Sequence, residues 1–376
     1  MNRHLHIVCL DVPWPADYGG AIDMMNRIIE LHKAGIRLHL HYFSYNERGR
    51  PKELEQFCES VNVYERKPAK KALGGKLPYI VASRIDEQLV NNLAKDDLPI
   101  LLEGIHCTGI LSQLNLDNRK VVVRMHNDES VYYHQLARAE SSFFKRIYFK
   151  RESRLLEKYS AHLPQQCTYA TVSETDSQRF SQHFHLPKVK FIPTFPAWQT
   201  VIGKEGLGNL CLYHGNLSVP ENEEAAIWLL RKVFNKVKTP FVIAGKKPSR
   251  HLVRLAHIYQ HTCIVADPSE QEINDLIRKA HINVLPCFNE ETTGIRLKLL
   301  HALFEGRHCV VNENMVKGTG LEDACHIGSN ADAIASIIVQ LQHHPFAEEE
   351  IRLRKELLLR TYNNKLNTEQ FIQCLY

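Results

Sequence analysis

The sequence predicts an α/β protein with two domains, each built on a parallel sheet. The chain has 376 residues, and at roughly 100–200 residues per domain this length favours two domains. A short apolar run, a glycine-containing turn, an amphipathic helix and a second apolar run follow one another from residue 4, and again from residue 210. Such β–α–β units build parallel sheets.

The first half opens with a predicted strand over residues 4–12, which Pro13 and Pro15 end. A helix follows over residues 21–34, because apolar residues recur there at helical spacing and Gly35 stops the pattern. A further helix, capped by Ser173, is expected to begin at Glu174. The remaining elements expected in this half are strands over 36–42, 100–102, 121–125, 168–172 and 190–192, and a long charged helix over 140–159.

Residues 195–209 carry proline, tryptophan and glycine without periodicity, and we interpret them as the connection between the domains. We place the domains at 1–197 and 210–360, with a linker over 198–209 and a last helix over 361–376 that returns to the first domain. In the second half we expect strands over 210–214, 241–244, 263–266, 282–286 and 308–311, and helices over 223–236, 270–280, 296–304, 331–342 and 348–362.

The composition is that of a soluble globular protein, with 44% apolar and 24% charged residues. The net charge of +5 is mild, and the basic residues do not interleave with aromatic residues in one stripe. We therefore do not expect a nucleic-acid partner. The charge fits a phosphorylated ligand or an anionic membrane surface.

The ten cysteines include no C-x-x-C pair, and several, such as Cys9 and Cys309, sit inside apolar runs. This pattern predicts buried free thiols in a reducing compartment. No clustered zinc ligands stand out. The first apolar run is too short for a signal peptide, and no run approaches the ~18–20 residues of a membrane span. We therefore expect a cytoplasmic protein, at most peripheral to the inner membrane surface.

In parallel sheets, ligands bind at the carboxyl ends of the strands, so the loops after strands hold the candidate site residues. In the first domain, Gly19 and Gly20 precede a helix, whose N-terminus favours an anion. His126 lies in RMHNDE directly after a strand, where it can bond a sugar hydroxyl or a phosphate oxygen. A tight turn without a ligand and a structural histidine are the alternatives.

Two loops of the second domain offer similar features. Gly215 and Asn216 stand in HGNLSVPEN after its first strand, where a glycine permits close approach to a phosphate or a base. Gly245 ends the second strand, and Lys246 and Lys247 follow it. These lysines can neutralise a diphosphate, although a solvated lysine pair is an equal alternative.

The loop and helix after residue 286, PCFNEETTGIRLKLLHALFEG, carry the most candidate groups. We expect Gly294 to open the helix, so that the N–H groups of the first turn bind phosphate beside the Thr293 hydroxyl. Arg296 and Lys298 add positive charge. Lys298 and His301 are three residues apart and therefore neighbours on one helix face. These groups together predict a diphosphate site.

In their order and spacing, these segments resemble the retaining GT-B glycosyltransferases of family 4 over nearly the whole chain. The resemblance rests on the Gly19-Gly20 loop followed by Arg27, and on the segments RMHNDE, VSE, HGN, IAG and GIRLKLLHA with its later glycine. It implies a GT-B fold, in which two Rossmann-like α/β domains face a central cleft. The activity it implies is sugar transfer from a nucleoside-diphosphate sugar to a glycan or lipid-linked acceptor with retention of configuration, in cell-surface polysaccharide synthesis.

The resemblance also implies roles for individual residues. Lys298, with Arg296 or Lys246, would stabilise the leaving diphosphate, and His126 would contact the transferred sugar. The Gly19-Gly20 loop would lie by the donor phosphates and the acceptor. The remaining candidate donor contacts are Gly215, Asn216, Gly245, Glu291, Thr293, Gly294 and His301. Such enzymes generally need no metal or other cofactor, and the sequence has no Asp-x-Asp motif.

The chain departs from the family pattern at the donor site. His301 stands where the family usually has a glutamate that binds the donor ribose. Thr293 stands at the family's first acidic position, with Glu290 and Glu291 before it. We expect Thr293, Glu290 or Glu291 to take over the donor-facing role. The departure keeps open a degenerate GT-B protein that binds a nucleotide sugar or a partner without transfer. A sugar-nucleotide epimerase, which would use the same phosphate site without an acceptor, is the other alternative.

Overall fold

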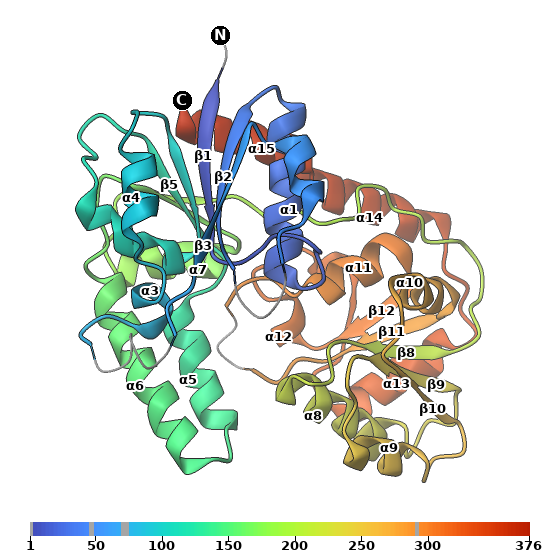
Figure 1. Ribbon diagram of the computed structural model, residues 1–376. Coiled ribbons are helices and arrows are strands. Elements are labelled where there is room, and N and C mark those ends of the chain that lie inside the picture. Colours follow the sequence, from blue (N-terminus) through green and yellow to red (C-terminus); the bar gives the residue numbers. More distant parts are fainter. Residues whose placement is uncertain (1–2, 45–48, 69–74, 290–292) are drawn as a thin grey trace. The chain divides into compact units, whose positions relative to one another are not determined.

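The computed structural model describes residues 3–44, 49–68, 75–289 and 293–376. The chain divides into two compact units (Figure 1). Unit 1 comprises Met1–Ala197, Thr293–Ile295 and Tyr362–Tyr376, and unit 2 comprises Trp198–Thr292 and Arg296–Thr361.

Unit 1 contains a seven-stranded sheet in the order β3-β2-β1-β4-β5-β6-β7, in which every neighbouring pair is parallel. Its inner strands are apolar runs buried on both faces, as parallel strands require. The strands are β1 (His4–Cys9), β2 (Arg37–Ser44), β3 (Ser60–Glu65), β4 (Ile100–Glu103), β5 (Val121–Met125), β6 (Thr168–Thr171) and β7 (Val189–Phe191).

Helices cover both faces of this sheet. Met24 and Ile28 of α1 share one apolar cluster with Phe371 and Leu375 of the last helix, α15, so the C-terminus of the chain packs on unit 1. The other face carries a second cluster, to which the remaining long helices contribute. The helical segments are α1 (Gly19–Lys33), η1 (Lys52–Phe57), α3 (Tyr79–Ala82), α4 (Glu87–Leu93), η2 (Ile105–Gln113), α5 (Glu129–Ala139), α6 (Phe143–Ser160), α7 (Glu174–Gln178), η3 (Arg179–His183) and α15 (Asn364–Leu375).

Unit 2 contains a six-stranded sheet in the order β10-β9-β8-β11-β12-β13, again with parallel pairs throughout. Its strands are β8 (Cys211–His214), β9 (Phe241–Gly245), β10 (Thr262–Ala266), β11 (Ile282–Leu285), β12 (His308–Val311) and β13 (His326–Ile327). Its helical segments are α8 (Pro220–Trp228), η4 (Leu229–Val233), α9 (Arg250–Ala256), α10 (Glu270–Lys279), α11 (Leu297–Glu305), α12 (Glu313–Val316), η5 (Glu322–Ala324), α13 (Ala331–Leu341) and α14 (Glu348–Thr361).

The prediction of two parallel-sheet α/β domains is confirmed. The strands expected over 121–125 and 308–311 have those bounds as β5 and β12. Ser173 caps α7, its hydroxyl accepting from the N–H of Asp176 at 3.1 Å. Ser269 forms a reciprocal capping box with Glu272 at the start of α10. None of the described helices is long and apolar enough to cross a membrane.

The expected start of the helix after β11 is wrong. That helix, α11, begins at Leu297, three residues after Gly294. Gly294 has a φ of +70°, and Arg296, at φ −88° and ψ 97°, is the extended residue that precedes the first helical turn. Neither conformation belongs to a helix.

Candidate functional site

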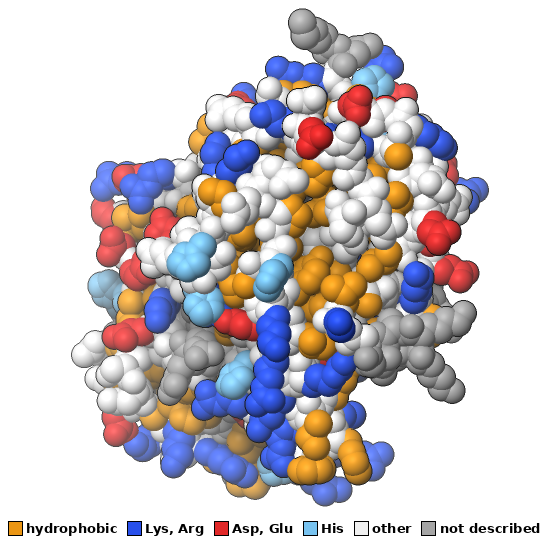
Figure 2. Space-filling model, turned by 90° about the vertical axis from the view of Figure 1, so that its left-hand side faces the viewer, with side chains coloured by type: hydrophobic (Ala, Val, Ile, Leu, Met, Phe, Trp, Pro, Cys, Tyr) orange, Lys and Arg blue, Asp and Glu red, His pale blue; other side chains and the backbone are white. Residues whose placement is uncertain are grey.

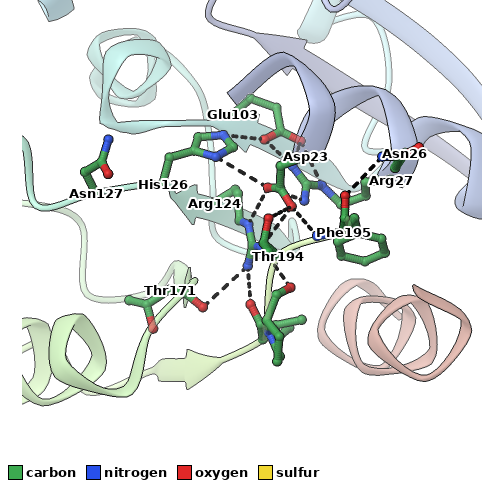
Figure 3. A network of polar contacts seen from close by, with 12 residues as sticks. Asp23, Asn26, Arg27, Glu103, Arg124, His126, Asn127, Thr171, Thr194 and Phe195 are labelled. Atoms are coloured by element: carbon green, nitrogen blue, oxygen red, sulfur yellow. Dashed lines mark hydrogen bonds and ion pairs between the residues drawn. The ribbon is translucent and has the colours of Figure 1, made fainter. Parts of the chain in front are cut away.

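Unit 1 holds a buried cluster of charged side chains at the carboxyl ends of β4 and β5 (Figure 3). Glu103 ends β4 and Arg124 lies in β5, while Asp23 and Arg27 come from α1. Arg27 donates to Glu103 at 2.5 Å and to Asp23 at 2.8 Å. The Nε of Arg124 lies 3.1 Å from the same Asp23 carboxylate. Two carboxylates therefore balance two guanidinium groups out of contact with water.

This balance keeps the carboxylates ionised. Burial alone would raise the pKa of Asp23, but the charges of Arg124 and Arg27 outweigh burial and hold it well below its usual range. The pKa of Glu103 is likewise lowered, because Arg27 and His126 overcome its burial. Breaking one member of such a group leaves an uncompensated buried charge, so the cluster must be kept whole.

The cluster also fixes the segment that leaves the sheet after β7. Arg124 donates to the carbonyl of Pro193 at 3.0 Å. Asp23 accepts from the hydroxyl of Thr194 at 2.9 Å and from the N–H of Phe195 at 2.7 Å. These bonds join α1 and β5 to residues 193–195, close to Ala197, where the first segment of unit 1 ends. They indicate a structural role for the four charged side chains of the cluster.

His126 is the one predicted catalytic residue in this region. It follows β5, its side chain is 12% exposed, and its Nε2 lies 3.0 Å from Glu103. Its Nδ1 lies 3.4 Å from Asp23. Both ring nitrogens thus face carboxylate oxygens, and a sugar hydroxyl that reached His126 would share or replace one of these contacts. The contact of His126 with the sugar stays a prediction.

Gly19 and Gly20 lie where the phosphate-loop prediction placed them, at the start of α1. Tyr18 precedes the helix without a side-chain cap, and the first turn contains no acidic residue. The first N–H groups of α1 therefore retain the partial positive charge that favours an anion. That an anion binds there stays a prediction.

Thr293 and Gly294 group with unit 1, where both bind Asp176. The Thr293 hydroxyl donates to one oxygen of Asp176 at 2.8 Å, and the Gly294 N–H donates to the other at 2.9 Å. A Cβ atom at Gly294 would overlap the side chain of Asn127 and approach the His126 carbonyl to 2.8 Å. Glycine is therefore required here by packing as well as by its positive φ. A phosphate at Thr293 or Gly294 would have to displace Asp176.

Three predicted donor contacts of unit 2 have local structural roles. A Cβ atom at Gly245 would overlap the carbonyl of Gly215, so the loops after β8 and β9 pack without space for a side chain. The exposed Asn216 caps its own turn, accepting from the N–H of Ser218 at 3.1 Å. Lys246 is exposed. These contacts to a donor remain predictions, as does that of Glu291, which lies outside the described residues together with Glu290.

Lys298 has an unusual environment at the carboxyl end of β8. Its Nζ lies 2.9 Å from Oδ1 of Asn222 and 3.4 Å from the hydroxyl of Tyr213. Among the described residues, no carboxylate forms an ion pair with it. Burial, and next the charge of Arg296, lower its pKa to about 8. A buried ammonium without a counter-charge is costly, and a bound anion would relieve that cost.

Unlike Lys298, Arg296 already has a carboxylate partner. Its Nη2 donates to Glu221 at 2.8 Å, and its Nε donates to the sulfur of Cys287 at 3.1 Å. The Glu221 carboxylate therefore already compensates the charge. Arg296 supports the site around Lys298, and a direct contact with a leaving group stays a prediction.

His301 and His214 place two buried imidazoles near Lys298. The ring of His301 stacks on Trp198, with centroids 4.1 Å apart and an interplanar angle of 18°, and it meets His214 edge-on at 5.9 Å. Nε2 of His214 is buried without a hydrogen-bond partner in the part of the chain that the structure describes, whereas Nε2 of His301 lies 3.6 Å from Oε2 of Glu305. Burial lowers the pKa of His214 well below its usual value. Unsatisfied buried nitrogens of this kind point to a ligand.

Sequence reasoning missed most of the groups that surround the predicted residues. Glu103 could have been predicted from the sequence, since it is a charged residue directly after the apolar run 100–102. Trp198 gave no such signal. Asn222 belongs to the HGNLSVPEN segment that the resemblance includes, but its contact with Lys298 could not be predicted, because the two are 76 residues apart and meet only in the folded chain.

The comparisons with known proteins agree with the fold. The family model described as "Glycosyl transferases group 1" matches residues 208–344, which lie in unit 2 except for Thr293–Ile295. A 44.6 kDa protein in the cps region of Klebsiella pneumoniae is 29% identical over 333 residues, covering 84% of each chain.

Solved structures match both units. Sucrose-phosphate synthase from Thermosynechococcus elongatus has a TM-score of 0.71 at 14% identity, covering 99% of this chain and 98% of its own. A TarM variant from S. aureus, in complex with fondaparinux, α-GlcNAc-glycerol and UDP, has a TM-score of 0.68 at 11% identity over 100% of each chain. The chain therefore has the GT-B fold. Together with the family match, this fold supports a glycosyltransferase.

Proposed function

We propose that this protein transfers a sugar from a nucleoside-diphosphate sugar to a glycan or lipid-linked acceptor, with retention of the anomeric configuration. The observation that carries the proposal is the Lys298 ammonium at the carboxyl end of β8, which is half-buried and forms no ion pair with any carboxylate of the described residues. A diphosphate supplies the missing negative charge. This edge of a parallel sheet is where ligands of α/β proteins bind.

The proposed chemistry follows from this charge. As the bond between the sugar and the diphosphate breaks, negative charge grows on the departing phosphate oxygen. A fixed ammonium in a water-poor site stabilises that growing charge more strongly than it stabilises the bound donor, which lowers the barrier. The unsatisfied Nε2 atom of His214 offers a further bond to the donor, and His301, whose Nε2 lies 3.6 Å from Glu305, lies beside it. No metal ion is required in this scheme, because Lys298 supplies the positive charge.

The comparisons bear on substrate class. The TarM variant was solved with UDP, and an E. coli enzyme with a TM-score of 0.62 to this chain was solved with UDP-2-fluoro glucose. The Klebsiella pneumoniae relative lies in a cps region. We therefore propose a nucleotide sugar as donor, and cell-surface polysaccharide assembly as the process.

A lipid-linked acceptor would require the protein to reach a membrane surface, and α6 offers a means. Phe143, Phe144 and Ile147 near its start are 59%, 82% and 50% exposed. The exposed basic residues of the same helix are Lys145, Arg146, Lys150, Arg154 and Lys158.

Figure 2 shows Lys and Arg side chains gathered on the lower part of this face of unit 1, beside protruding apolar side chains. The two glutamates of α6 do not offset this charge, because Glu152 is buried and Glu157 pairs with Arg179 at 2.9 Å. Exposed aromatics beside a basic helix face suit the interface of an anionic bilayer. We propose that this surface, the α6 patch, contacts the inner membrane face.

The test is turnover of a panel of nucleoside-diphosphate sugars, with and without a membrane extract as acceptor source. We expect nucleoside diphosphate to be released, and we expect the sugar to enter a lipid or glycan fraction only when acceptor is present. NMR of the product should show the anomeric configuration of the donor. Release of free sugar without acceptor would indicate an epimerase, and donor binding without turnover would indicate a degenerate binding protein.

A further inference from the structure

Unit 2 carries a second group of polar side chains that the proposed transfer does not use. His308 begins β12, His326 begins β13, and Glu350 lies in the first turn of α14. One ligand atom from each of these residues lies within 4.8 Å of the other two. His308 stands at the amino end of its strand, whereas the Lys298 site lies at a carboxyl end.

The three atoms have the spacing of metal ligands. Nδ1 of His308 lies 3.1 Å from Oε1 of Glu350 and 3.3 Å from Nε2 of His326. The third side of the triangle, from His326 to Glu350, is 3.8 Å. Zinc bonds to nitrogen and oxygen are about 2.0–2.1 Å long, so tetrahedral ligand atoms are about 3.3–3.4 Å apart.

Hydrogen bonding around the triangle directs lone pairs into it. Nε2 of His308 donates to the carbonyl of His344 at 3.0 Å, and its Nδ1 faces Glu350. Metal-binding histidines usually donate their other ring N–H to a carbonyl or carboxylate in this way. Oε2 of Glu350 accepts the N–H of Ala347 at 3.1 Å, which leaves Oε1 for the triangle. A metal ion, or a proton on Nδ1, can bridge these two atoms.

Among the described residues, the neighbouring cation Arg354 does not fill that place. The guanidinium of Arg354 donates to the carbonyl of Gly306 at 2.9 Å and to that of Arg307. In contrast, the triangle of Asp23, Glu103 and His126 in unit 1, whose ligand atoms also lie close together, already has two guanidinium groups against its carboxylates.

Two further histidines, His281 and His344, lie beside His308. The ring of His281 is occupied, because it accepts from Gly208 at 3.1 Å and bonds the Leu341 carbonyl at 2.7 Å. A cavity of about 360 Å³ opens beside the triangle and is lined by His326, His344 and Glu350. It has room for a water molecule as a fourth ligand.

We propose that unit 2 binds one Zn²⁺ through Nδ1 of His308, Nε2 of His326 and Oε1 of Glu350, with water completing the tetrahedron. The ion would join the edge strand β13 and the start of α14 to β12. The ligands are 18 and 24 residues apart in the sequence, and they do not form a short zinc-binding motif. The proposal does not depend on the transferase function.

The test uses the full chain without an affinity tag, stripped of metal by a chelator and titrated with Zn²⁺ against a chromophoric competitor. One zinc per chain is expected, with a higher Tm when zinc is bound. His326→Ala and Glu350→Gln should each weaken binding at least tenfold. The control His257→Ala, an exposed histidine of the same unit, should leave it unchanged.

X-ray absorption of the zinc-loaded protein provides a second readout. Nitrogen and oxygen neighbours at about 2.0–2.1 Å, without sulfur, are expected. A sulfur neighbour, no zinc binding by the wild type, or equal binding by His326→Ala and His257→Ala would overturn the proposal. Circular dichroism of each variant confirms that lost binding is not lost folding. Glu350→Gln keeps the side-chain shape if His326→Ala does not fold.

Discussion

Nζ of Lys298 lies 2.9 Å from Oδ1 of Asn222, and this amide oxygen is the nearest partner that the structure gives the half-buried ammonium. An amide carries no net charge, so the contact satisfies a hydrogen bond but does not neutralise the lysine. The folded protein therefore keeps a positive charge at the carboxyl end of β8 at a cost in stability. In the proposed function, that cost is offset when a diphosphate binds.

Replacing Lys298 by methionine should separate function from stability. We expect Lys298→Met to lower kcat by about 10²–10³-fold, the usual effect of removing one preorganised donor at a developing charge. Because methionine removes a buried unpaired charge and keeps the length of the side chain, the free energy of unfolding should not fall. Steady-state kinetics and denaturant unfolding measure the two effects. Lys232→Met, at an exposed lysine of the same unit, is the control. A Lys298→Met enzyme with wild-type kcat would contradict the assignment.

The pH dependence of stability should carry the signature of the same lysine. Its pKa is about 8 in the folded chain against 10.5 ordinarily, so between these values the unfolded state binds more protons and stability rises with pH. Below pH 8 the full penalty, roughly 3 kcal/mol, is present. The difference in unfolding free energy between wild type and Lys298→Met should therefore shrink as pH rises from 8 to 10.5. A difference that stays constant over this window would show that Lys298 titrates normally.

Mutation of the charge cluster of unit 1 should lower the free energy of unfolding, in contrast to Lys298→Met. Asp23→Asn leaves Arg124 and Arg27 with one carboxylate between them, and we expect it to lower the free energy of unfolding by about 3–5 kcal/mol. Asp117→Asn, at an exposed aspartate of unit 1, should change it little. Urea unfolding compares the two variants. Equal stability of both would mean that the cluster is not a structural centre.

The α6 patch predicts membrane binding that depends on both charge and apolar contact. Wild-type protein should co-sediment with vesicles rich in phosphatidylglycerol, and less so with phosphatidylcholine vesicles or at high salt, where the charges are screened. Replacing Phe143 and Phe144 together by serine should abolish this binding. Ile258→Ser is the matched control, because Ile258 is 72% exposed in unit 2. Equal loss in both variants, or equal binding to both vesicle types, would argue against the patch.

Much of the fold could be predicted because its strands are short apolar runs that end at prolines, glycines or polar residues. β3 (Ser60–Glu65) escaped because SVNVYE alternates weakly and lies at the sheet edge, where burial is incomplete. α5 (Glu129–Ala139) escaped because its sequence, ESVYYHQLARA, is largely polar and lacks a clear apolar face.

The candidate site could be predicted only in part. Loops after strands led to His126 and Lys298, because position in a parallel sheet is a local property of the sequence. Their partners are not local, since Glu103 is 23 residues from His126 and Asn222 is 76 residues from Lys298. Gly294 was predicted wrongly for a similar reason. A glycine before an apolar run resembles a helix start, but in the structure Gly294 packs against Asn127 with a positive φ, and the helix starts at Leu297.

The central claim is that the Lys298 site binds the diphosphate of a nucleotide, and calorimetric titration of nucleoside diphosphates at pH 7 tests it most directly. We expect at least one nucleoside diphosphate to bind the wild type, and at 100 times its Kd to add about 2.7 kcal/mol to stability. Binding should be at least tenfold weaker in Lys298→Met and weaker in His301→Ala. Failure of every nucleoside diphosphate to bind, or equal affinity for wild type and Lys298→Met, would contradict the account.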